Sequence, residues 1–194
     1  MTETSNVRQS LKKLLDGNRR CATCKQQNPR QDAKRRKEVT KGQKPFAVIV
    51  GCSDSRIPPE LIFDQGLGDL FVVRLAGNIV DALALGSIEY AVEHLGTKLV
   101  VVLGHGKCGA VTAAAQSADA PGHVSAIVKA IQPAIKKVQK MPGDLVDNAI
   151  RANTSLVVGK IKTSKPILAE MVEKGEIEVI GAYYNIETGA VEIL

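Results

Sequence analysis

The sequence predicts an α/β fold of three layers: a mostly parallel central β-sheet flanked by helices, with an N-terminal helical arm. Two observations carry this prediction. Short apolar runs rich in β-branched residues recur along the chain, and three of them are apolar throughout, as is typical of strands covered on both faces. Helical patterns lie between these runs, and glycine, proline and aspartate mark the boundaries.

The first 40 residues predict the helical arm, and residues 44–194 predict the α/β core of a single domain spanning 1–194. The arm has an apolar helical pattern that passes through Val7, Leu11 and Leu14 and closes at Cys21 and Cys24. Two cysteines at i and i+3 share one face of a helix. A redox pair would instead follow a strand and open a helix. We therefore interpret Cys21 and Cys24 as small packing residues.

The strands of the core are expected in four runs, at 44–51, 69–77, 97–104 and 176–186, and the tail "GAVEIL" pairs with the fourth through a turn at Thr188–Gly189. A helix is expected over 78–96 and ends at Gly96. Its buried face should carry Ile79, Leu83, Ile88, Ala91, Val92 and Leu95. An alanine-rich helix follows residue 109. Residues 123–174 are expected to be mostly helical, with breaks at Pro142–Gly143 and Pro166.

The net charge of +6 comes largely from basic residues between positions 8 and 44, including "KRRK" at 34–37. With three Phe, three Tyr and no Trp, the chain has little to stack on bases. We interpret the basic run as a solvated face and expect no nucleic-acid partner. No apolar run approaches the ~20 residues of a bilayer span, and the N-terminus does not resemble a secretory signal. We expect a cytoplasmic protein without a membrane partner, whose four cysteines are thiols or metal ligands.

Gly104, Gly106 and Gly109 spell G-x-G-x-x-G after the third apolar run, which is the pattern of a dinucleotide-binding loop. That loop normally follows the first strand, with an acidic residue about 20 positions later at the next strand's end. Here the downstream residues indicate loop and helix instead. The context argues against a dinucleotide-binding module.

His105 and Cys108 lie inside the same loop, and both are good ligands for a transition metal. Cys52, at the end of the first strand, joins them if the two strands are neighbours. Two thiolates and one imidazole would leave a tetrahedral zinc with one open position, as in catalytic sites. Asp54 and Arg56 alternate with Cys52 along an extended segment, so all three would face one pocket.

These motifs resemble those of the β-class carbonic anhydrases. "CSDSR" at 52–56 and "HGKC" at 105–108 match the family's Cys-x-Asp-x-Arg and His-x-x-Cys motifs, and the likeness extends to "LLDGNRR", "FVVRLAGN" and "GSIEYAVEHLG". The resemblance implies one zinc ion per chain, with Cys52, His105 and Cys108 as its ligands. It also implies a catalytic dyad of Asp54 and Arg56.

The activity implied by the resemblance is the reversible hydration of carbon dioxide to bicarbonate and a proton. Asp54 would orient the zinc-bound water, and Arg56 would keep Asp54 ionised. Gln43, Phe71 and Tyr90 correspond to residues that line the substrate pocket in plant-type members. Ala76 stands where those members have Val, which predicts a slightly wider apolar wall.

The resemblance further implies a homodimer or a multiple of dimers, with the N-terminal helix as an arm around a partner subunit. The absence of Trp, together with Gln43, Phe71 and Tyr90, favours the subtype in which Asp54 leaves zinc free. Hydrolysis of carbonyl sulfide or carbon disulfide on the same zinc scaffold stays open as an alternative. A zinc module without turnover is disfavoured, because a structural zinc needs no Asp–Arg dyad.

Overall fold

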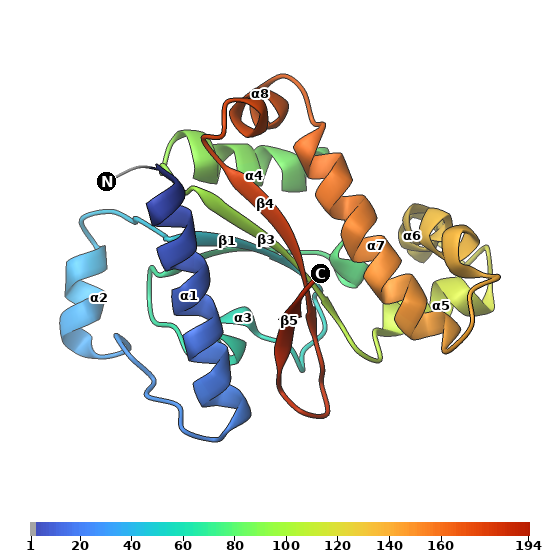
Figure 1. Ribbon diagram of the computed structural model, residues 1–194, viewed down its shortest axis with the longest axis horizontal. Helices are drawn as coiled ribbons and strands as arrows, with labels where there is room; N and C mark the ends of the chain where they lie inside the picture. The colour runs from blue at the N-terminus through green and yellow to red at the C-terminus, as the bar shows by residue number, and fades with distance from the viewer. Residues whose placement is uncertain (1–2) are drawn as a thin grey trace.

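A computed structural model describes residues 3–194, and Figure 1 shows their arrangement. The strands of this described part form one five-stranded sheet in the order β2-β1-β3-β4-β5. They are β1 (Ala47–Gly51), β2 (Leu70–Arg74), β3 (Leu99–His105), β4 (Glu178–Tyr184) and β5 (Val191–Ile193). The first four strands are parallel, and β5 pairs antiparallel with β4. The predicted α/β class and mostly parallel sheet are confirmed.

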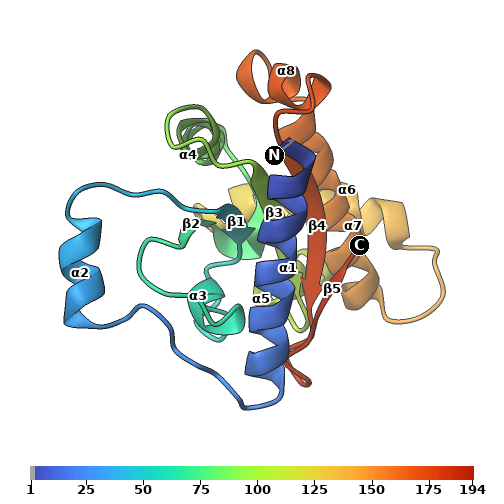
Figure 2. The ribbon, with the colours of Figure 1, turned by 60° about the vertical axis from the view of Figure 1, so that its left-hand side comes forward.

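Helices flank both faces of the sheet, as Figures 1 and 2 show. They are α1 (Glu3–Ala22), α2 (Ala33–Val39), α3 (Pro59–Ile62), α4 (Ala82–Glu93), α5 (Gly109–Gln116), α6 (Val124–Val138), α7 (Leu145–Lys162) and α8 (Ile167–Glu173), with a short 3-10 turn η1 (Ala76–Asn78). The helical stretch expected over 123–174 is therefore present as α6, α7 and α8. None of the helices in residues 3–194 has the length and apolar character that a bilayer span requires.

Two hydrophobic cores lie on opposite faces of the sheet, because successive side chains of a strand point to opposite sides. Ile49 and Val101 pack toward α1 and α3, where Leu14 is 1% exposed. Val48 and Val100 pack on the other face, toward α4, α7 and α8. Strands buried on both faces explain the continuous apolar runs of the sequence.

The N-terminal helix packs on its own chain rather than reaching away from it. Val7 and Leu14 of α1 are buried in the core beside α3. Asn18, also buried, donates to the carbonyls of Ile62 at 3.2 Å and Gly189 at 2.8 Å and accepts from the amide of Val191 at 2.8 Å. Part of the apolar face of α1 is thus covered within the subunit, and the expectation that this helix also reaches a partner stays a prediction.

The segment after α1 is fastened by two buried carboxylates. Asp64 accepts hydrogen bonds from the Arg20 side chain at 2.6 Å and from the amides of Gln27 at 3.1 Å and Asn28 at 2.9 Å. Both carboxylate oxygens of Asp69 accept hydrogen bonds from Nε of Arg30, at 3.0 Å and 2.9 Å. The short helix α2, which carries the basic run, buries none of its own residues and stands apart from the sheet in Figure 2.

Helix α4 begins later and faces differently than its pattern predicts. Asp81 is its N-cap, and the carboxylate accepts a hydrogen bond from the amide of Ala84 at 2.8 Å. The helix therefore begins at Ala82, and Ile79 lies before it. Its buried side carries Ala84 and Ile88, among others, whereas Leu83 is 82% exposed. The prediction that Leu83 faces the core was wrong.

Cys21 and Cys24 do not share a helix face. Helix α1 ends at Ala22, and the chain then turns, with Cys24 at a left-handed φ of 55°. Cys21 is half-buried and Cys24 is exposed. The interpretation of Cys24 as a packing residue was therefore wrong, because the helix stops before its side chain can return to the core.

Candidate metal centre

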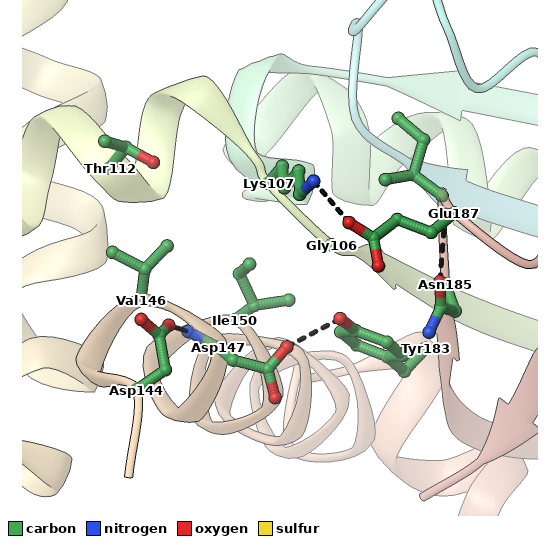
Figure 3. Close-up of a pocket in the computed structure, with 11 residues that line it drawn as sticks. Gly106, Lys107, Thr112, Asp144, Val146, Asp147, Ile150, Tyr183, Asn185 and Glu187 are labelled. Atoms are coloured by element: carbon green, nitrogen blue, oxygen red, sulfur yellow. Dashed lines mark hydrogen bonds and ion pairs between the residues drawn. The ribbon is translucent and has the colours of Figure 1, made fainter.

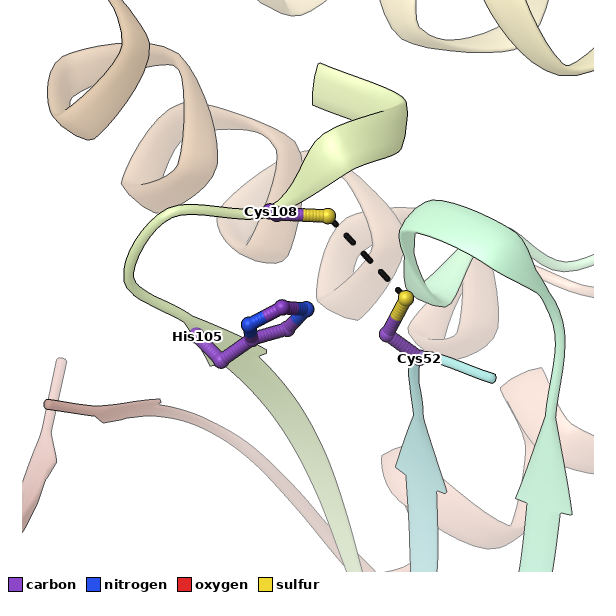
Figure 4. Close-up of side chains that lie close together, drawn as sticks. All are labelled: Cys52, His105 and Cys108. Atoms are coloured by element: carbon purple, nitrogen blue, oxygen red, sulfur yellow. Dashed lines mark hydrogen bonds between the residues drawn. The ribbon is translucent and has the colours of Figure 1, made fainter. Parts of the chain in front are cut away.

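The carboxyl ends of β1 and β3 bring the predicted ligands together. The two strands pair in parallel, with Gly51 opposite Leu103. Cys52 follows β1 directly, while His105 ends β3 and Cys108 precedes α5. The condition set by the sequence, that the two strands be neighbours, is met, and Figure 4 shows the three side chains converging.

The geometry of the group fits a tetrahedral metal. The sulfur atoms of Cys52 and Cys108 lie 4.0 Å apart. One ligand atom each from these cysteines and His105 all fall within 4.8 Å of one another, and the three residues are buried. Two zinc–sulfur bonds of about 2.3 Å at a tetrahedral angle separate the sulfurs by roughly 3.8 Å. The spacing found here requires almost no adjustment.

His105 presents the nitrogen that such a metal would need. Its Nδ1 lies 3.0 Å from the carbonyl oxygen of Gly106, which fixes the ring with a proton on Nδ1. The other nitrogen, Nε2, is buried and has no hydrogen-bond partner among residues 3–194. A buried polar atom without a partner is costly, and a metal ion between it and the two sulfurs would satisfy it.

The two cysteines are electrostatically linked. The hydrogen bond with Cys108 lowers the pKa of Cys52 to about 4 against the effect of burial, with smaller contributions from His105 and the amides of Asp54 and Gly77. The same hydrogen bond and burial raise the pKa of Cys108. Two thiols this close titrate as a pair, and the hydrogen bond between them stabilises the first thiolate that forms. A thiolate is thus available to bind a cation.

Asp54 and Arg56 form the dyad expected from their spacing. The guanidinium contacts both carboxylate oxygens, at 2.9 Å and 2.7 Å, and this pairing lowers the pKa of Asp54 to about 2. One oxygen of Asp54 also lies 4.0 Å from His105 Nε2. An ionised carboxylate therefore stands at the edge of the metal centre.

Arg74 is a site residue that sequence reasoning missed. Its Nε donates to the carbonyl of Cys52 at 2.7 Å, and its Nη2 donates to the carbonyl of Asp54 at 2.6 Å. It thereby fixes the backbone of the ligand-bearing loop. A signal existed, since Arg74 is the charged residue that closes an otherwise apolar strand, "LFVVR".

The glycines of the ligand loop do not make the left-handed turn between His105 and Cys108. The left-handed turn between the two ligands occurs at Lys107, with a φ of 57°, rather than at Gly104, Gly106 or Gly109. A Cβ on Gly104 would meet Thr154 Oγ1 at 2.2 Å. This glycine is required for close packing of β3 on α7, and a Cβ on Gly109 would meet open space.

A cavity of about 390 Å³ lies behind the ligand loop and is drawn in Figure 3. Gly106 and Lys107 form part of one wall. Lys107 pairs with Glu187 at 2.5 Å, and the hydroxyl of Tyr183 donates to Asp147 at 2.6 Å. The pair of Lys107 and Glu187 joins the ligand loop to the turn between β4 and β5.

Of the residues predicted to line the substrate pocket, one lies near the metal centre and three lie away from it. Ala76 lies beside the metal centre, since the amide of the next residue, Gly77, donates to Cys52 Sγ at 3.1 Å. Phe71 sits opposite Val48, three residues before the end of β2, which is about 10 Å from the site along the strand.

Tyr90 accompanies Phe71, with ring centroids 6.3 Å apart. Gln43 lies ahead of the amino end of β1, in a groove with Lys41 and Lys44. Within one chain, these three side chains do not reach the centre formed by Cys52.

The chain is similar to known carbonic anhydrases. A family model described as carbonic anhydrase matches residues 47–191. The carbonic anhydrase of Mycolicibacterium smegmatis is 39% identical over 97% of this chain and 94% of its own length. Carbonic anhydrase 2 of Mycobacterium tuberculosis is 38% identical over 92% of this chain and 88% of its own.

A solved structure of similar fold comes from the tetrameric β-carbonic anhydrases of Sordaria macrospora. It aligns with a TM-score of 0.76 and 28% identity over 81% of this chain and 84% of that chain. The residues matched by the family model, 47–191, include both strands whose ends carry the three candidate ligands.

Proposed function

Because the chain belongs to the β-carbonic anhydrase family, which catalyses the reversible hydration of carbon dioxide, we propose that it does so with one zinc ion held by Cys52, His105 and Cys108. One observation carries the proposal: two sulfurs and a buried, unpartnered imidazole nitrogen converge on one point. Soft thiolates and imidazole are ligands that suit zinc. The cytoplasm, a reducing compartment, suits two thiol ligands that would otherwise be open to oxidation.

When bound, zinc supplies a Lewis acid that lowers the pKa of water toward neutrality. The carboxylate of Asp54 accepts a hydrogen bond from the attacking water and so directs an oxygen lone pair at carbon dioxide. Arg56 keeps Asp54 ionised, and the low pKa of this carboxyl supports that role. The proton is lost to solvent, and bicarbonate is the product.

The substrate pocket is completed by a second copy of the chain. Ala76 forms the apolar wall near Cys52, while Gln43, Phe71 and Tyr90 belong to the partner's contribution. Their distance from their own metal centre supports this arrangement. A second copy would also cover the exposed face of α4, which carries Leu83 and Tyr90, and the ring of Tyr90 lies near Phe71 of the edge strand β2. A homodimer or a multiple of dimers follows.

Stopped-flow measurement of carbon dioxide hydration on protein of known zinc content tests the proposal. We expect turnover in proportion to bound zinc. Carbonyl sulfide and carbon disulfide, which are also linear triatomic molecules, are measured alongside. Turnover of either one without carbon dioxide hydration would assign the same centre to the alternative hydrolase reaction.

A further inference from the structure

The sulfur of Cys52 accepts a hydrogen bond from the backbone. The amide of Gly77 lies 3.1 Å from Cys52 Sγ, and both groups are buried. Gly77 has a left-handed φ of 70°, and its turn is closed by the amide of Asn78, which donates to the carbonyl of Leu75 at 3.0 Å. This backbone conformation favours glycine, and it directs the amide toward the sulfur.

A side chain of helix α7 binds the carbonyl group of Gly77. The side-chain amide of Asn153, which is 2% exposed, donates to the carbonyl of Gly77 at 2.8 Å. Packing supports the contact, because a Cβ on Gly77 would meet Ile131 Cδ1 at 2.7 Å. Gly77 is therefore fixed at its carbonyl by α7 and at its amide by the thiol of Cys52.

A buried amide such as that of Asn153 is costly unless it is hydrogen-bonded, and an aliphatic side chain would pack at this position without that cost. Its hydrogen bond is directed at one carbonyl, two bonds along the backbone from the Gly77 nitrogen. This contact restrains the ψ of Gly77, and it holds the Gly77 Cα, to which the N–H directed at the sulfur is attached. This coupling gives the buried asparagine a purpose beyond packing.

We propose that Asn153 is a positioning residue that aims the Gly77 amide at Cys52 and thereby limits the charge this thiolate donates to the metal. The inference rests on the proposed zinc site. Two thiolate ligands supply much negative charge, which opposes the Lewis acidity that hydration needs. A hydrogen bond to the sulfur withdraws part of that charge, as outer groups do around other metals.

Replacing zinc with cobalt(II) provides a spectroscopic measure of the hydrogen bond from Gly77 to Cys52. The thiolate-to-cobalt charge-transfer band absorbs light at an energy that depends on the electron density of the sulfur. Asn153→Ala removes the donor and leaves space, whereas Asn153→Leu removes the donor and fills it. In both variants we expect the charge-transfer band to move to longer wavelength. We also expect kcat/KM for carbon dioxide with zinc to fall by about 10-fold, the lower end for outer-sphere residues.

Lys160→Met is the matched control. Lys160 also lies on α7 and donates to a carbonyl of the same connection, that of Val80 at 2.7 Å, without contacting Gly77. Its loss should loosen the connection but leave the cobalt band in place. An equal shift in Lys160→Met would show that general loosening, rather than the Asn153 contact, moves the band, and would overturn the inference.

The remaining outcomes separate this inference from the proposed function. If the wild-type chain binds one cobalt and the band is unchanged in both Asn153 variants, the inference is overturned and the metal site stands. If the wild-type chain binds no metal at this centre, the proposed function fails and the inference fails with it. Metal content measured on every variant tells the two results apart.

Discussion

Arg56 binds both carboxylate oxygens of Asp54, with Nε 2.9 Å from Oδ1 and Nη2 2.7 Å from Oδ2. The same Nη2 lies 3.0 Å from the carbonyl oxygen of Lys107. One guanidinium therefore ties the loop after β1 to the loop after β3. Because each loop carries metal ligands, Arg56 influences both the state of Asp54 and the spacing of the centre.

Replacing a thiolate ligand should remove the metal. In Cys52→Ser and Cys108→Ser, a hydroxyl replaces a soft anionic ligand, and zinc prefers the thiolate. We expect zinc per chain to fall well below one and carbon dioxide hydration to fall with it. Elemental analysis of dialysed protein measures the first, and stopped-flow assay the second.

The other two cysteines are the control for that experiment. Cys21 lies in the last turn of α1 and Cys24 follows it. Neither belongs to the group of ligand atoms formed by Cys52, His105 and Cys108, so Cys21→Ser and Cys24→Ser should keep one zinc per chain. Full zinc occupancy in Cys108→Ser would contradict the proposed ligand set. Loss of zinc in Cys24→Ser would assign this pair a role in metal binding that its position does not indicate.

A charged residue on the exposed face of α4 should abolish activity by preventing two copies of the chain from associating. Leu83 is 82% exposed, and Tyr90 follows it on the same helix. Leu83→Asp places a charge where a second copy would pack, so we expect a shift from dimer to monomer in sedimentation analysis. Hydration should fall together with the dimer fraction, because the partner would no longer supply Gln43, Phe71 and Tyr90.

Met141→Asp is the corresponding control, since Met141 is also exposed, at 55%, but lies between α6 and α7. Its assembly and its activity should match those of the unmodified chain. A monomer that retains full activity after Leu83→Asp would show that one chain builds the whole substrate pocket, contrary to the proposal.

The chemistry of the metal centre could be predicted from the sequence, because it depends on which residue types follow the strands. Cysteine and histidine at the ends of apolar strands, with Asp54 and Arg56 alternating after Cys52, indicate ligands and a carboxylate in one pocket. Parallel strands place their carboxyl ends at the same edge, so distant positions meet there. The start of α4 was placed too early, at residue 78, although Asp81 is a common type of N-cap residue.

Relationships across the fold could not be predicted in this way. Asn153 lies in an ordinary amphipathic helix, and nothing in its neighbours indicates that it reaches Gly77. Gly104 is spaced like a phosphate-loop glycine, yet close contact with Thr154 is what requires it. Phe71 could be identified from its motif as a pocket residue, but the motif does not indicate whether it lines the pocket of its own chain or that of a second copy.

The buried carboxylate of Asp64 should contribute to stability. Burial alone would raise its pKa, but hydrogen bonds from Gln27, Arg20 and Asn28 outweigh burial and lower it. Asp64→Asn replaces an oxygen acceptor by a donor and removes the charge facing Arg20. We expect the free energy of unfolding to fall by about 2 kcal/mol at pH 7. Chemical denaturation measures the change.

The pH dependence follows from the direction of that shift. A carboxyl whose pKa is lowered in the folded state stabilises the fold above its unfolded pKa of about 3.9, and this contribution is lost as the pH falls through the folded value. The difference between Asp64→Asn and the wild type should therefore shrink in acid. Asp16→Asn, at an exposed ion pair with Lys12, should change stability much less, because solvent screens this pair. A constant difference across this pH range would contradict the assignment.

The last prediction concerns the position of Asp54 when zinc is bound. An ionised Asp54 has two competing partners, the zinc ion and the guanidinium of Arg56. A bidentate pair with arginine is strong and fixed in geometry, and the backbone amide of Arg56 adds a third hydrogen bond at 3.0 Å. We expect Asp54 to stay with Arg56 near neutral pH and to leave zinc's fourth position open.

Arg56→Ala removes the competitor and should let Asp54 bind zinc, which would lower hydration by at least about 10-fold while zinc content is retained. Arg56→Lys keeps the charge but not the two-point contact, so the activity that this variant loses measures what the geometry of the pair adds to its charge. The decisive measurement is a crystal structure of the zinc-loaded protein at neutral pH. An Asp54 oxygen at about 2.0–2.2 Å from zinc would defeat the prediction. In that case the pull of the metal exceeds three hydrogen bonds, and the absence of Trp from the chain is a poor guide to the state of Asp54.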